Sequence, residues 1–351
     1  MKKIFVTAAL GLSLFLPGCT ADAKVQKPDA ASSSDPNASE PQSAELFAMD
    51  TVMTLTAYGS RAQPALDAAS AEIERLDSLF SISSDSGDIK PLNEAKSGQV
   101  SDDTAALLAR SLKVSASTDG IFDCTIAPVM NAWGFPTGKF HVPGKEELAS
   151  LLSRVDYRQI QISGDTVTLP KGVEIDLGGI AKGYASDRVM QVFAENGVKS
   201  GLISLGGNVQ TLGAKPDGSR WRIAVQDPVN AEETFAVVEV ENEAVITSGG
   251  YQRYFEQDGV HYHHIIDPRT GYPAQNGILS STIVSADGTL ADGLSTSLFI
   301  MGLEQAKEYW QAHRDAFDAI LMTDDGQVYI TEGLEGRCTL TDGSIAQVIR
   351  G

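Results

Sequence analysis

The chain has 351 residues, of which 42% are hydrophobic and 21% are charged, and its formal net charge is −19. This composition is that of a globular protein with a sizeable buried core. The acidic excess leaves no basic stripe to neutralise a phosphate backbone, so we expect no nucleic-acid partner. With only three cysteines, a metal site built from thiolates is excluded as well.

The first 18 residues are predicted to be an export signal peptide. Two lysines precede an apolar run over residues 4–16 that is too short to span a bilayer comfortably. The sequence LPGC, which ends at Cys19, resembles a bacterial lipoprotein lipobox, with Pro17 where a small residue is usual. The sequence therefore predicts an exported protein that a lipid on Cys19 anchors to a bacterial cell membrane, facing outside the cytoplasm.

Residues 19–45 are rich in Ser, Ala, Pro and Asp and contain no large apolar cluster, which favours a flexible tether. Residues 46–351 are the predicted folded domain. It begins with a strand over 46–59, followed by helices over 64–80 and 102–117, and Ser101 caps the second helix. An apolar loop over 118–135 and a short helix over 145–154 come next. A hairpin over 160–179 and a helix over 180–196 complete this half.

The second half of the domain is predicted to be mostly strands. They fall within 201–213, 221–228, 234–250, 251–268 and 278–288, and helices over 290–302 and 304–313 precede a closing hairpin around 323–332. Runs of strands with a few helices packed against them indicate an α+β fold, and no period of 20 to 50 residues repeats.

The segment EIDLGGIAKGYASDRV, residues 174–189, is the first candidate site. Gly178 and Gly179 lie where a strand-like run gives way to a helical pattern, and Lys182 falls in the first turn of that helix. A cation is mildly unfavourable there, because the helix dipole already places partial positive charge at the N-terminus. Exposed amides, permissive glycines and a lysine together indicate a phosphate-binding site. A tight turn with a solvated lysine is the alternative.

The segment ADGLSTSLF is the second candidate site, because Asp292 and Thr296 stand four residues apart in it. Side chains at this spacing share one face of a helix. Two oxygen donors so placed suit Mg²⁺, which takes oxygen ligands and usually needs only one or two of them from side chains. A helix cap with an incidental threonine is the alternative.

Three of the five histidines fall within HYHHIIDPRTG. On an extended strand, Tyr262, His264 and Ile266 point to one face, while His261 and His263 point to the other. One face could therefore present a general base, and packing across strands is expected for at least two of the histidines. No carboxylate or thiol at a usual spacing completes a zinc site.

Seven motifs occur in one order, namely MDTVMT, DGIFDCTIAPVMNAWGF, IDLGGIAKGYASD, SLGGN, TSGGYQRYF, HHIIDPRTGYP and ADGLST. In this order they resemble the ApbE family of FAD:protein FMN transferases, over residues 47–303. The resemblance implies a T-fold-like α+β architecture of mixed sheets with packed helices. It also implies a magnesium-dependent enzyme that cleaves FAD, releases AMP and attaches FMN to a threonine or serine of an exported or membrane electron-transfer protein.

The resemblance also implies roles for individual residues. His264 matches the histidine proposed as the base that activates the acceptor hydroxyl, and Lys182 would face the pyrophosphate of FAD. Ser83 stands where many members carry an aromatic residue over the flavin ring, so stacking is not expected from it. The implied FAD contacts are Met49, Ser83, Ile121, Phe122, Asp123, Asp176, Lys182 and Ile266, and the implied metal ligands are the Gly179 carbonyl, Asp292 and Thr296.

Two other functions fit the same residues. An FAD pyrophosphatase would use water as the acceptor and release free FMN with AMP, and a non-enzymatic flavin-binding lipoprotein would bind FAD without turnover. The sequence also leaves open whether Cys124 and Cys338 form a disulfide or stay free.

Overall fold

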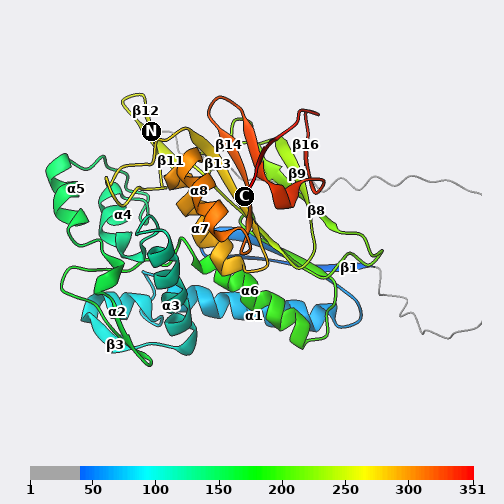
Figure 1. Cartoon of the computed structure of the whole chain (residues 1–351). Coiled ribbons are helices and arrows are strands. Elements are labelled where there is room, and N and C mark those ends of the chain that lie inside the picture. Colours follow the sequence, from blue (N-terminus) through cyan, green and yellow to red (C-terminus); the bar gives the residue numbers. More distant parts are fainter. Residues whose placement is uncertain (1–39) are drawn as a thin grey trace, which may run out of the picture. The chain divides into compact units, whose positions relative to one another are not determined.

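The computed structural model describes residues 40–351, which form an α+β fold as expected (Figure 1). The predicted export signal, the lipidated cysteine and most of the predicted tether lie outside these residues. Within the described part, the helices are all too short or too polar to cross a membrane.

A nine-stranded sheet runs through the domain, and its neighbouring strands are antiparallel except for the last pair, which is parallel. In order across the sheet the strands are β1 (Pro41–Ala48), β2 (Thr51–Tyr58), β6 (Gly201–Leu205), β7 (Asn208–Leu212), β10 (Ala244–Gly249), β13 (Ile278–Ser285), β14 (Asp318–Thr323), β15 (Val328–Thr331) and β17 (Gln347–Ile349).

The first strand differs from the prediction in two ways. Residues 46–59 belong to two strands of a hairpin, because the chain turns at Met49 and Asp50. In addition, β1 begins at Pro41, so residues 41–45 of the predicted tether belong to the sheet. Small and polar residues suffice there because β1 is an edge strand that buries only one face, and a proline is tolerated as its first residue.

Four helices pack closely on this sheet, namely Ala62–Phe80, Ala181–Glu195, Gly288–Met301 and Leu303–His313. The helices that the sequence predicts are confirmed within a few residues. Ser101 caps its helix as expected, since its hydroxyl accepts the Thr104 N–H at 3.3 Å. Two helices were not predicted. One spans Ile89–Ala95, and the other lies within the apolar loop predicted over 118–135, where a proline is compatible with the first turn. The helices are α1 (Ala62–Phe80), α2 (Ile89–Ala95), α3 (Asp102–Ser117), α4 (Ala127–Trp133), α5 (Lys145–Leu152), α6 (Ala181–Glu195), α7 (Gly288–Met301) and α8 (Leu303–His313), with 3₁₀ turns at Cys124–Ile126, Tyr157–Gln159 and Glu332–Leu334.

Three small sheets complete the described part. Strands β16 (Cys338–Leu340), β9 (Thr234–Val240) and β8 (Trp221–Gln226) form one, and β11 (Tyr254–Gln257) and β12 (Val260–His263) form a hairpin. The third contains β3 (Ser97–Gln99), β5 (Thr166–Thr168) and β4 (Gln161–Ser163). Residues 174–177 are predicted to be strand-like, but they do not form a strand. Their side chains are buried alternately, as in a strand, but the segment pairs with no strand in the described part of the chain.

The two faces of the main sheet support two separate hydrophobic cores. On β13, Ile283 faces the core shared with α1, α6 and α7, whereas Val284 faces the core shared with β8 and β9. This alternation follows from the two-residue period of a strand. The helices α1, α6 and α7 lie next to one another on the first side (Figure 1).

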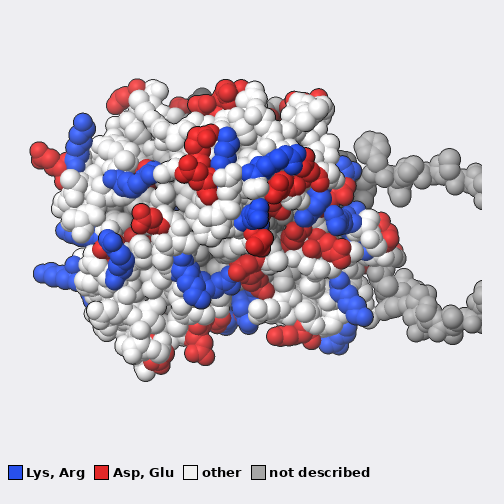
Figure 2. Space-filling model, in the orientation of Figure 1, with Lys and Arg blue, Asp and Glu red and all other residues white. Residues whose placement is uncertain are grey.

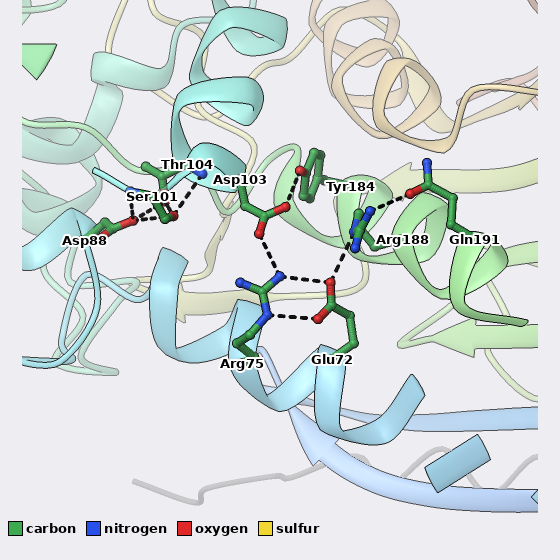
Figure 3. Close-up of polar contacts among 9 residues, drawn as sticks. All are labelled: Glu72, Arg75, Asp88, Ser101, Asp103, Thr104, Tyr184, Arg188 and Gln191. Atoms are coloured by element: carbon green, nitrogen blue, oxygen red, sulfur yellow. Dashed lines mark hydrogen bonds and ion pairs between the residues drawn. The ribbon is translucent and has the colours of Figure 1, made fainter. Parts of the chain in front are cut away.

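Ion pairs join α1, α3 and α6 at their solvent edge (Figure 3). Arg75 of α1 bonds Glu72 at 2.8 Å and Asp103 of α3 at 2.6 Å. The Asp103 carboxylate also accepts the hydroxyl of Tyr184 in α6 at 2.6 Å, and Arg188 reaches Glu72 at 3.1 Å. The first two turns of α6 are thereby fixed to both neighbouring helices.

Candidate active site

The first turn of α6 holds the glycine and lysine motif. Gly178 and Gly179 are exposed and precede the helix, and Lys182 is partly buried within it. A Cβ atom at Gly179 would lie 3.1 Å from the ring of Phe122, so these two predicted site residues are in contact. Exposed backbone next to a helix start can approach an anionic ligand closely.

Asp292 of α7 reaches this turn directly. Its Oδ2 accepts the N–H of Gly183 at 2.8 Å, and its Oδ1 accepts the side-chain amide of Asn208 at 3.0 Å. The residue is only 5% exposed. Burial raises the pKa of Asp292, and the nearby ammonium of Lys182 opposes this increase. A carboxylate has about four lone-pair positions, so this buried group keeps acceptor capacity for a cation.

The Gly179 carbonyl is the second oxygen available to a metal. In a regular helix it would accept the N–H of Gly183 four residues later, but that N–H bonds to Asp292 instead. Within residues 40–351, no backbone N–H bonds the Gly179 carbonyl. The carboxylate bonds the first turn of α6 and this carbonyl precedes the same turn, and both are hard oxygen donors of the kind that Mg²⁺ prefers.

The hydroxyl of Thr296 lies one turn along α7 from Asp292, as the spacing predicted. It lies 3.2 Å from the Ser248 hydroxyl, which also bonds Ser295 at 2.8 Å. With Asp292 and the Gly179 carbonyl, this makes an all-oxygen donor set that fits Mg²⁺ rather than zinc. Consistently, the described residues contain no group of three His, Cys, Asp or Glu side chains that could hold a metal.

Lys182 connects this oxygen set to two other predicted site residues. Burial raises the pKa of Asp176. The hydrogen bond from the Gly178 N–H and the positive charges of Arg253 and Lys182 oppose this increase. Burial also lowers the pKa of His264 to about 3, with Arg253, His263 and Lys182 acting in the same direction. The Lys182 ammonium is thus within electrostatic range of Asp176, Asp292 and His264.

The ring of His264 is held by the chain that precedes β11. Its backbone N–H donates to the Arg253 carbonyl at 3.0 Å, and its Nδ1 lies 3.1 Å from the same oxygen. The edge of the Phe135 ring packs against it, with ring centroids 6.3 Å apart. An imidazole whose pKa is this low is neutral at physiological pH and keeps a free lone pair, but it is a weaker base than an ordinary histidine.

The strand β12 ends at His263, but the predicted alternation continues beyond it. Tyr262 and Ile266 belong to one apolar cluster, whose Phe135 contacts His264, whereas Ile265 belongs to the main core. Ile266 is only 4% exposed, so its side chain offers a ligand little surface. The expected packing role of two histidines is confirmed. His261 stacks on Tyr254 at 4.0 Å, and His263 bonds the Ala274 carbonyl at 2.9 Å.

Met49 lies in the strained turn between β1 and β2. This turn is at the same end of the main sheet as the turn between β6 and β7. Met49 and Asp50 have φ angles of 48° and 60°, which are uncommon for residues other than glycine. Thr51, which follows Asp50, lies close to the turn between β6 and β7. A Cβ atom added at Gly206 of that turn would lie 2.7 Å from Cγ2 of Thr51. The turn between β6 and β7 leads directly to Asn208, whose side-chain amide bonds Asp292. Backbone strain of this kind often marks a functional site.

The remaining predicted FAD contacts are less open. The side chains of Ile121 and Phe122 are 8% and 5% exposed. The Asp123 carboxylate is occupied by the N–H and hydroxyl of Thr125, at 2.8 and 2.6 Å, and by the Tyr157 N–H. This segment can therefore offer a ligand mainly backbone groups and ring edges.

Ser83 is the last of the predicted FAD contacts. It is exposed in the turn after α1, and among the described residues its side chain bonds only that of Ser81, at 3.0 Å. It forms no hydrogen bond with Lys182, Asp292 or His264.

The two cysteines within residues 40–351 do not pair. Cys124 is buried beside Asp123 and Asp176, and Cys338 is partly buried on β16; both are free. Burial raises the pKa of Cys124 to about 12 and that of Cys338 to about 11. Neither thiol is therefore a nucleophile at neutral pH.

The site also contains residues that the sequence analysis did not assign. Asn208 and Gly183 hold Asp292, Ser248 bonds Thr296, and Arg253 holds His264. Asn208 and Arg253 occur in the motifs SLGGN and TSGGYQRYF. The motifs identify these segments, but the partners of each residue lie in distant parts of the chain.

Known proteins resemble this chain over most of its length. The ApbE family model matches residues 49–321. The FAD:protein FMN transferase of Treponema pallidum is 32% identical over 316 residues, covering 83% of this chain and 87% of the relative. The FAD:protein FMN transferase of Escherichia coli K12 is 28% identical over 339 residues, with 92% and 93% coverage.

Two solved structures share the fold. The ApbE protein of Thermotoga maritima has a TM-score of 0.81 and 30% identity, and covers 85% of this chain and 99% of its own. The flavin transferase ApbE of Vibrio cholerae has a TM-score of 0.76 and 26% identity, with 85% and 100% coverage. The predicted fold type and enzyme class are confirmed by these relatives, and the chain belongs to the ApbE family of flavin transferases.

Proposed function

We propose that this protein transfers the FMN moiety of FAD to a threonine or serine hydroxyl of an acceptor protein, in a Mg²⁺-dependent reaction that releases AMP. The observation that carries the proposal is the buried Asp292 carboxylate, which accepts the Gly183 N–H at 2.8 Å in the first turn of α6, the turn that also contains Lys182. The name FAD:protein FMN transferase, shared by the curated relatives, supports FAD as the substrate.

The first part of the reaction is substrate binding. The pyrophosphate of FAD lies at the start of α6, where Lys182 and the exposed backbone of Gly178 and Gly179 approach it. Asp292, Thr296 and the Gly179 carbonyl would hold Mg²⁺. When bound, the metal offsets phosphate charge as the leaving group departs.

The second part is the transfer itself. The acceptor hydroxyl oxygen forms a bond to the phosphorus on the riboflavin side of the pyrophosphate, and the bond from that phosphorus to the bridging oxygen breaks. AMP leaves with the bridging oxygen. The imidazole of His264, which its low pKa keeps neutral at physiological pH, takes the proton of the acceptor hydroxyl.

The products distinguish this function from its alternatives. With FAD, Mg²⁺ and a protein acceptor, we expect AMP and protein-bound FMN to form in equal amounts, measured by chromatography and by flavin fluorescence of the denatured acceptor. Release of free FMN with AMP, in the presence of that acceptor, indicates a pyrophosphatase. Tight FAD binding without either product indicates a carrier.

We also propose that the protein works outside the cytoplasm, attached to a bacterial cell membrane by a lipid on Cys19. The supporting observations are the basic and apolar start of the chain and the lipobox-like sequence LPGC. The acceptor is then an exported or membrane-bound flavoprotein that meets the enzyme at the same surface.

A further inference from the structure

We propose that Arg253 is a positioning residue for His264: its carbonyl fixes the imidazole tautomer, and its guanidinium fastens that carbonyl to the neighbouring apolar cluster. The proposal rests on the proposed function, in which His264 accepts the proton of the acceptor hydroxyl.

The carbonyl of Arg253 determines which nitrogen of His264 carries the hydrogen. It accepts the backbone N–H of His264 at 3.0 Å and lies 3.1 Å from Nδ1 of the same residue. Because a carbonyl oxygen can only accept, the second contact requires a hydrogen on Nδ1. In the neutral ring, the lone pair is then on Nε2, which is the nitrogen left to act as a base.

The position of Arg253 in the hairpin explains why its carbonyl can do this. Arg253 immediately precedes β11, and His264 immediately follows β12, so the two residues meet at the open end of the hairpin. A loose end would let this contact fray. The side chain of Arg253 prevents that by donating to the carbonyl of Phe135, in the segment after α4.

Phe135 completes the arrangement. It is fully buried, and its ring contacts both Phe255 of β11, at 5.9 Å between centroids, and the imidazole of His264, at 6.3 Å. The guanidinium therefore connects the backbone on one side of His264 to the aromatic ring on the other. Loss of the guanidinium is expected to free both contacts of the imidazole together.

The charged groups around His264 act in the same sense. Besides burial, the Arg253 guanidinium, His263 and the Lys182 ammonium each lower the pKa of His264. Asp176 is the acid close to the two cations, and it is itself buried. An imidazolium would thus face two cations, so removal of the Arg253 charge is expected to raise the pKa of His264.

The direct test is nitrogen NMR of the full chain labelled at histidine, which reports the tautomer of His264 without any reaction. A His264→Gln variant assigns the signal. We expect Nδ1–H with an unprotonated Nε2 in the native protein, and mixed tautomers in Arg253→Gln. An Nε2–H tautomer in the native protein would overturn the proposal, whether or not FMN transfer is detected.

Kinetics give the second readout. In Arg253→Gln we expect kcat for FMN transfer to fall roughly 10- to 100-fold, as for a displaced catalytic group, with KM for FAD nearly unchanged. The acid limb of its pH profile should move to higher pH, because His264 becomes easier to protonate. Arg222→Gln, at an exposed position on β8, should match the native protein in both respects.

Arg253→Lys separates positioning from folding, since it keeps the charge while losing the planar guanidinium. We expect the acid limb to stay near its native position and kcat to remain reduced, at a native melting temperature. Native kcat and pH profile in Arg253→Gln would contradict the proposal. If the native protein transfers no FMN, the proposed function fails, while the tautomer measurement still decides the role of Arg253.

Discussion

Asp292 is the residue on which metal binding depends most. Its buried carboxylate accepts one neutral N–H on each oxygen and forms no ion pair among the described residues. In Asp292→Asn, the side chain keeps its size but loses its charge. We expect Mg²⁺-dependent turnover to be abolished, and Mg²⁺ alone to raise the melting temperature of the native protein but not of the variant, because a ligand stabilises only a fold that binds it.

The control for this measurement is Asp67→Asn, at an exposed position on α1. It removes the same charge far from the oxygen donor set, so its turnover and its response to Mg²⁺ should equal those of the native protein. Native turnover of Asp292→Asn at limiting Mg²⁺ would remove this residue from the metal site.

Lys182 gives the second prediction at this scale. In Lys182→Ala, FAD binding should weaken by about 1 to 3 kcal/mol, the range for a charge-assisted hydrogen bond. Riboflavin, which has no phosphate, should be affected far less, and calorimetry with both ligands measures the difference. Lys113→Ala, an exposed lysine on α3, is the matched control. Equal losses for FAD and riboflavin would argue against a pyrophosphate contact.

Some of these residues could be identified from sequence and others could not. Asp292 and Thr296 were identifiable because their four-residue spacing is a local property of one helix. Asn208 was not, because it binds Asp292 across 84 residues of chain. Sequence reasoning placed His264 on a continuing strand, and the structure instead holds it by backbone contacts beyond the end of β12.

At the scale of elements, the site depends on how closely α6 and α7 approach. A Cβ atom at Gly183 would lie 2.6 Å from Cβ of Asp292, which real side chains do not tolerate. Helix propensity alone favours Gly183→Ala by about 1 kcal/mol. Overpacking costs about 1 to 3 kcal/mol, so we expect net destabilisation in denaturant unfolding, together with a higher Mg²⁺ requirement.

Gly98→Ala is the control for this variant, because a Cβ atom at Gly98 meets nothing within 4 Å. Its free energy of unfolding and its Mg²⁺ requirement should stay close to native values. If Gly183→Ala is as stable as the native protein and needs no more Mg²⁺, the close contact of the two helices does not shape the metal site.

The errors in predicting elements have a common cause in turn geometry. Met49 and Asp50 form the turn between β1 and β2 at positive φ, where glycine or asparagine would have given a clear signal. In α4, Pro128 falls in the first turn, where a proline does not interrupt a helix, so the segment predicted as a loop is partly helical. Helices α1, α3 and α6 were predicted well because each has a long apolar period.

At the scale of the whole molecule, the net charge and the distribution of charged side chains agree with the expectation that the partner is not a nucleic acid. Acidic and basic side chains are interspersed on the face shown in Figure 2, and that face carries no continuous basic stripe. With a net charge of −19, the chain repels a polyanion.

The membrane proposal makes a prediction about the full chain. In Cys19→Ala, the lipid can no longer attach, so we expect the protein to move from the membrane fraction to the soluble extracytoplasmic fraction in cell fractionation. FMN transfer by the purified variant should be unchanged, because residues 40–351 contain all the proposed catalytic groups. Membrane retention of this variant would contradict a lipid anchor at Cys19.

The most direct test of the central claim is the intact mass of a purified acceptor flavoprotein after incubation with FAD and Mg²⁺. Native enzyme and His264→Ala are compared side by side, with His261→Ala as the matched control. We predict that the native enzyme and His261→Ala add the mass of one FMN at a threonine or serine. His264→Ala should bind FAD equally well but act roughly 10²- to 10⁴-fold more slowly, the usual share of general-base catalysis. An acceptor that keeps its original mass while FMN and AMP accumulate, or one that His264→Ala labels at the native rate, would contradict the account.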